Sequence, residues 1–109
     1  MAIYNYKVRL SPKEAFEKIK LNQNADLVYE EEFQLNGDKF TGTLIFEKYY
    51  MRAKNRAALI VLINDFSGLT HITSVSTGSS EGIIFNFDWG AADDFANSVG
   101  EILHDFIIY

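Results

Sequence analysis

The sequence predicts a single α+β domain spanning residues 1–109: a curved antiparallel sheet of five to six strands in the order β-α-β(4–5)-α, with a long C-terminal helix packed across one face. Three observations predict it. Apolar and polar residues alternate at the start, a helix-start signature follows directly, and several strand-like segments then precede one amphipathic stretch. The length of 109 residues leaves no room for a second domain.

Residues 2–10 have the period of two that is typical of a half-buried strand. One face of this strand would carry Tyr4, Tyr6, Val8 and Leu10. A helix start follows at Ser11-Pro12-Lys13-Glu14. Ser11 can cap the helix, Pro12 suits the first helical position, and Glu14 completes a capping box. We expect this helix to run to about Gln23, with Ala15, Phe16 and Ile19 facing inward.

A run of strands follows, at residues 26–36, 39–51, 57–65 and 69–77, with a further short one at 83–87. Asn36-Gly37 tolerates the positive φ angles of a hairpin turn, and Ser67-Gly68 marks a second turn. Segment 57–65 is apolar on both faces, so we place it centrally in the sheet.

The final helix is predicted to begin after Asp88, which can cap it. Its apolar stripe would consist of Phe95, Val99, Ile102, Leu103 and Phe106. Gly100 lies inside this helix at a cost of about 1 kcal/mol relative to alanine, so we expect another backbone or side chain to approach it closely.

Composition excludes several classes of site. With no cysteine and only two histidines, His71 and His104, without metal-ligand spacing, we expect no metal and no cofactor. All ten Lys and Arg lie between Lys7 and Arg56, so the second half is purely acidic and predicts no nucleic-acid partner.

The longest strongly apolar run is the seven residues 57–63, far short of the ~20 that a spanning helix needs. The N-terminal residues lack the pattern of a secretory signal. We therefore expect no membrane partner and a cytoplasmic location.

The element order resembles the helix-grip or TATA-binding-protein-like class, in which a curved antiparallel sheet holds a long C-terminal helix. Residues 76–90, STGSSEGIIFNFDWG, are similar to the C-terminal portion of a small bacterial family known only as a domain of unknown function. The first resemblance implies a fold, and neither implies an activity.

Strand parity gives the candidate ligand site. In segment 27–35 the odd positions are mainly apolar, so Tyr29 and Glu31 should face the core unless a bulge intervenes, and the same parity turns His71 inward. A carboxylate and an imidazole there can anchor a ligand or act as a general base with its partner. The alternative is structural: a charge on an edge strand opposes aggregation, and a single histidine usually forms a structural hydrogen bond. Trp89, at the start of the final helix, would either form the lip of a cavity under that helix or plug the end of the sheet.

An aromatic and basic cluster at a hairpin end is the candidate interface. It consists of Tyr49, Tyr50, Arg52, Lys54 and Arg56. Its alternative interpretation is an exposed turn whose tyrosines pack along their strands.

Three functions follow from these sites. The first is non-enzymatic binding of a small apolar or aromatic ligand between the sheet and the C-terminal helix. The second is a protein-interaction module that acts as a homodimer or with another partner. The third is an enzyme that uses Glu31 and His71, and for this one the sequence offers no substrate class.

Overall fold

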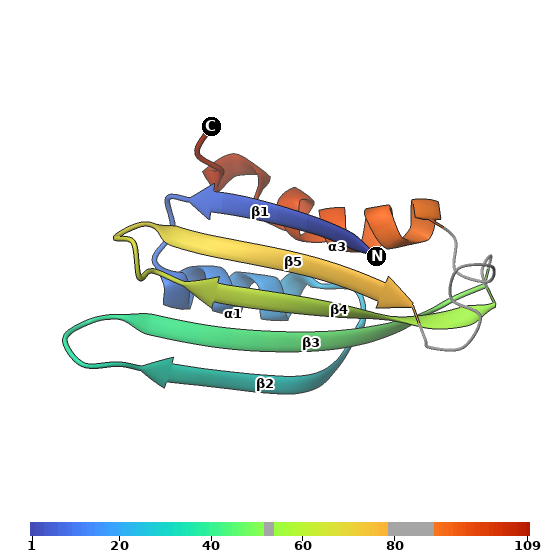
Figure 1. Ribbon diagram of the computed structural model, residues 1–109, viewed down its shortest axis with the longest axis horizontal. Helices are drawn as coiled ribbons and strands as arrows, with labels where there is room; N and C mark the ends of the chain where they lie inside the picture. Colours follow the sequence, from blue (N-terminus) through green and yellow to red (C-terminus); the bar gives the residue numbers. More distant parts are fainter. Residues whose placement is uncertain (52–53, 79–88) are drawn as a thin grey trace.

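The computed structural model describes residues 1–51, 54–78 and 89–109. The elements are β1 (Ala2–Val8), α1 (Pro12–Asn22), β2 (Asp26–Gln34), β3 (Phe40–Tyr50), β4 (Asn55–Asn64), β5 (Thr70–Gly78) and α3 (Trp89–Ile102), followed by a 3-10 turn at His104–Phe106 (Figure 1). The predicted strand at 83–87 and the predicted cap Asp88 lie outside the described residues.

The described strands form one open antiparallel sheet in the order β1-β5-β4-β3-β2. This confirms an α+β fold built on an antiparallel sheet, with segment 57–65 at its centre. The two hairpin turns also lie where the sequence places them, because Gly37 and Gly68 adopt φ angles of 82° and 95°.

Helix α1 begins as its sequence predicts. The Ser11 side chain accepts a hydrogen bond from the Glu14 backbone N–H at 3.1 Å, and the Glu14 carboxylate accepts one from the Ser11 N–H at 3.0 Å. The inward residues Ala15, Phe16 and Ile19 are all buried. Helix α1 therefore contributes three apolar side chains to the core.

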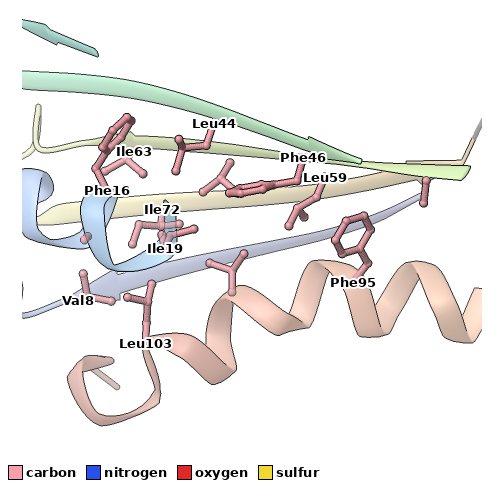
Figure 2. Packing of buried hydrophobic residues seen from close by; sticks show 14 of the residues in the cluster. Val8, Phe16, Ile19, Leu44, Phe46, Leu59, Ile63, Ile72, Phe95 and Leu103 are labelled. Carbon is pink, nitrogen blue, oxygen red and sulfur yellow. The ribbon is translucent and has the colours of Figure 1, made fainter. Parts of the chain in front are cut away.

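Both helices lie on the same face of the sheet, and the core fills the space between them and the strands (Figures 1 and 2). Figure 2 shows Leu44, Phe46 and Leu59 from the sheet directed toward side chains of the helices. Phe95, Val99 and Leu103 bury the predicted stripe of the C-terminal helix. We call the opposite side of the sheet the open face, since no described element covers it.

Helix α3 lies close to β5, because the Ser74 hydroxyl donates to the carbonyl of Ala96 at 2.8 Å. Helix α3 also lies close to β1, which explains why residue 100 is a glycine: a Cβ there would come within 2.6 Å of the Tyr6 hydroxyl oxygen. The expected close approach at Gly100 is thus confirmed. In the described ranges no helix is both long and apolar enough to span a bilayer.

Candidate functional site

The predicted inward orientation of Tyr29 and Glu31 is wrong. The register between β2 and β3 shifts at Val28, so that Tyr29 pairs with Ile45 and Glu31 with Thr43 on the open face. Their neighbours Glu30 and Glu32 instead face the helix side, where Lys20 and Lys13 of α1 pair with them. The bulge thus exchanges the two faces of β2.

His71 also lies on the open face, contrary to the prediction, opposite Lys7 and Asn64. The parity is misleading because the core side of β5 carries hydroxyls. Thr70 donates to the carbonyl of Leu10 at 2.6 Å, and Ser74 donates to α3. These side chains are buried because each finds a partner, so their polarity does not indicate exposure.

Glu31 and His71 share a face but are far apart. Strands β4 and β3 lie between their strands, which separates them by about 14 Å at the usual strand spacing. Direct proton transfer between them is therefore excluded by this geometry, as is a shared position beneath α3. The side chain of Trp89, the fourth candidate, lies outside the described residues.

The predicted interface cluster does not form one surface. Tyr49 lies on the open face and is 51% exposed, whereas Tyr50 points to the helix side and packs against Phe95 with ring centroids 5.5 Å apart. Arg56 pairs with Glu47 at 3.2 Å and with Asp26 at 3.8 Å. Lys54 is exposed in the adjoining turn, and Arg52 lies outside the described residues.

A groove of about 690 Å³ lies along β1, at the edge of the sheet. One wall comes from β1 and the other from the exposed side of α3, with the C-terminal segment closing one end. The lining residues are Asn5, Tyr6, Lys7, Leu69, Asn97, Gly100, Glu101, His104, Ile107, Ile108 and Tyr109. The groove thus lies beside the sheet, whereas the buried stripe of α3 fills the space beneath that helix.

The C-terminal segment already occupies part of the β1 edge (Figure 1). The N–H of Ile108 donates to the carbonyl of Lys7 at 2.8 Å, and the N–H of Arg9 donates to the carbonyl of Phe106 at 2.8 Å. Ile107 opposes Val8 in an antiparallel bridge and packs against the core. This edge therefore accepts an extended segment with an inward-facing apolar side chain.

The rest of the edge has no strand beside it within the described ranges. The backbone N–H and C=O groups of successive residues point to opposite sides of a strand, so those of Ile3 and Asn5 point the same way as those of Lys7, away from β5. Two outward positions thus present backbone N–H and C=O groups along this edge, Asn5 at the groove and Ile3 next to it.

The groove is aromatic at its base and acidic along α3. Burial is the main cause that raises the pKa of Tyr6 to about 12, so its phenol stays neutral at physiological pH. Its hydroxyl donates to Asn97 Oδ1 at 3.4 Å, while the Tyr4 hydroxyl donates to Asp93. Glu101 and His104 are exposed on the helix wall, and Lys7 lies across from them on β1.

Sequence reasoning missed this groove. The alternation of residues 2–10 reveals the strand but not its position at an edge, and the acidic side of the last helix looks like an ordinary solvated surface. No pattern in the sequence marks residues 107–109 as an extended segment against β1. Among the described residues no group of three or more His, Cys, Asp or Glu side chains is arranged to hold a metal ion.

Comparison with protein families matches the chain to the "Family of unknown function (DUF6054)" over residues 1–107. No curated protein and no solved structure matches. The predicted resemblance to a family without assigned function is thus confirmed, whereas the helix-grip resemblance, the bacterial origin and the cytoplasmic location stay predictions.

Proposed function

The chain belongs to the DUF6054 family of unknown function, and we propose that it is a non-enzymatic binding module that takes an extended peptide along the free edge of β1. The observation that supports this most directly is the C-terminal segment, which bonds to the same edge through Lys7 and Arg9. A partner strand would continue from there along Asn5 and Ile3. Addition of a strand to a sheet edge takes affinity from main-chain hydrogen bonds and specificity from alternate side chains.

The groove indicates the side chains of such a peptide. Those on its helix side would meet the Tyr6 ring, the flat surface at Gly100 and the apolar Ile107, which favour an aromatic or aliphatic residue. The next position on that side would lie beside Glu101 on a helix that carries no Lys or Arg, which favours a basic residue. The proposed partner is therefore an extended segment that combines apolar and basic side chains.

A small apolar or aromatic molecule is the second candidate, because a groove of about 690 Å³ lies within the usual size range of small-molecule sites. Such a ligand would use the Tyr6 ring and the Asn97 and Glu101 side chains. It would have no need of the outward backbone groups of β1, and this difference separates the two candidates.

The test is selection of random twelve-residue peptides on the immobilised protein, followed by affinity measurement on two variants. Asn5→Pro removes an outward N–H from the edge, a position at which proline is tolerated in sheets. Asn5→Ala keeps that N–H, and both variants lose the same 2.8 Å hydrogen bond from Thr73 Oγ1. We expect selected peptides to bind Asn5→Ala and to lose tenfold or more in affinity for Asn5→Pro.

Equal affinity of the two variants would reject strand addition. Ile3→Pro, one outward position further along, gives the same test if Asn5→Pro does not fold. Retained mass of a small molecule in native mass spectrometry of the purified protein, together with no peptide enrichment, would move the proposal to the second candidate.

A further inference from the structure

The open face of the sheet carries a continuous apolar row that crosses all five strands. Registers between neighbouring strands place five side chains side by side in this row: Ile3, Val75, Ile60, Ile45 and Tyr29. Ile3 is 54% exposed and Tyr29 47% exposed at its two ends. A row of this length on the face opposite the core packs against no other described element and indicates a contact surface.

The neighbouring rows add apolar groups at the centre and opposite charges at the two edges. Leu62 of β4 lies in the next row, between Thr73 and Thr43. Lys7 lies on β1 at one edge and Glu31 on β2 at the other. Within the described part of the chain neither has an ion-pair partner, and Glu31 accepts one hydrogen bond, from the Tyr29 hydroxyl at 2.8 Å.

We propose that a second copy of this chain covers the open face, related by a two-fold axis parallel to the central strand β4. Such an axis exchanges β1 with β2 and β5 with β3 and keeps each row at its own level. The apolar row of one subunit then lies on the apolar row of the other, with Ile60 against Ile60 and Ile3 against Tyr29. Two sheets in this arrangement pack like the halves of a β-sandwich, about 10 Å apart.

Charge selects this axis over the alternative. With the axis along β4, Lys7 of one subunit lies above Phe33 and close to Glu31 of the other, and two-fold symmetry forms this contact twice. An axis perpendicular to the strands would instead stack β1 on β1 and β2 on β2. Passing through Ile60, it would leave Lys7 far from Glu31 of the other subunit and place Glu31 opposite the acidic Asp26, which is unfavourable.

The available surface is large enough for a specific dimer. Three rows across five strands cover roughly 500 Å² per subunit at standard strand dimensions, before the relief of the side chains is counted. Two such faces reach about 1,000 Å², the lower end for specific interfaces. The centre of this face, Ile60 and Leu62, does not line the β1 groove, whereas Lys7 borders both, so the variants at Ile60 test the dimer separately from the groove.

Cross-linking tests the axis. The chain has no cysteine, so Ile60→Cys introduces one thiol at the point where the two copies meet. A short bis-maleimide should convert this variant into a covalent dimer. Leu21→Cys is the matched control, because Leu21 is 77% exposed on α1, on the far side of the sheet, and this variant should form no covalent dimer.

Charge exchange tests the pairing. Lys7→Glu and Glu31→Lys each place like charges opposite one another, so sedimentation equilibrium should show each weakening the dimer about tenfold or more. The double variant should restore the affinity. The two exchanged charges cannot pair within one subunit, because four strand spacings, about 19 Å, separate positions 7 and 31 there. Asp38→Lys, a charge reversal in the β2–β3 turn, is the control that should change nothing.

A wild-type protein that stays monomeric at about 1 mM would overturn the proposal. So would equal cross-linking of the position-60 and position-21 thiols, or a double variant no tighter than the singles. If circular dichroism shows that Lys7→Glu or Glu31→Lys does not fold, Ile60→Lys serves as the test instead. It places a charge on the two-fold axis and should give a folded monomer. A folded Ile60→Lys dimer would reject the face, and peptide binding at β1 would remain untouched by any of these results.

Discussion

The ring of Phe16 lies directly over Gly42, and a Cβ added at Gly42 would come within 2.7 Å of Phe16 Cδ2. This contact packs α1 against the centre of β3. Phe16 is fully buried there, and its ring meets the Phe40 ring edge-on, with ring centroids 5.9 Å apart. A side chain at position 42 would push the helix off the sheet. Gly42 is therefore required by packing, since its φ angle is not in the left-handed region.

Gly42→Ala should lower the free energy of unfolding by about 2 kcal/mol, the usual cost of overpacking a closed core. Denaturant unfolding measures it. In a Phe16→Leu background, where the ring is gone, the same substitution should cost less than about 0.5 kcal/mol. An equal cost in both backgrounds would show that the Phe16 ring is not the obstacle.

Ser11→Ala should destabilise the protein by about 1 kcal/mol, because it removes the side-chain oxygen that caps α1. Thermal unfolding measures the loss. Ser11→Asp keeps a capping oxygen and should retain the wild-type stability within about 0.5 kcal/mol. Failure of aspartate to substitute for serine would contradict a capping role.

Stability should fall at acid pH in part through Glu14. The hydrogen bond from the Ser11 backbone N–H, and second to it one with the Ser11 side chain, hold the pKa of Glu14 below its usual 4.5. A lowered pKa in the folded state contributes stability that is present above the usual pKa and is lost as pH falls through the lowered value. Glu14→Gln should therefore reduce the loss of unfolding free energy that is measured between pH 6 and pH 3.

Tyr6 and Tyr50 should ionise at higher pH than a free tyrosine. Burial raises the pKa of each to about 12. The stability that their burial provides is complete below pH 10 and is lost as pH rises toward 12. In ultraviolet titration, Tyr6→Phe and Tyr50→Phe should each remove one phenol that ionises late. Loss of an early phenol from Tyr6→Phe would show that its ring is solvated.

The elements were predictable because each has a local physical signature. The Ser11-Pro12-Glu14 start and the glycine turns follow from hydrogen bonding and backbone conformation within a few residues. The centrality of 57–65 follows from apolar residues on both faces. These features need no knowledge of the rest of the chain.

The faces of β2 and β5 were not predictable in the same way. A bulge at Val28 reverses the parity of β2, and the approach of α3 makes Ser74 a buried residue. Both depend on partners distant in the sequence. The groove was missed for the same reason, because only the tertiary structure places Glu101 and the C-terminal segment beside Asn5.

Hydrogen exchange of individual amides by NMR tests the central claim, the free edge of β1, most directly. We predict that the amides of Ile3 and Asn5 exchange rapidly in the free protein, that those of Tyr4 and Tyr6 are protected by β5, and that a selected peptide protects Asn5. Slow exchange at Asn5 in the free protein, or no change on peptide binding, would contradict strand addition at this edge.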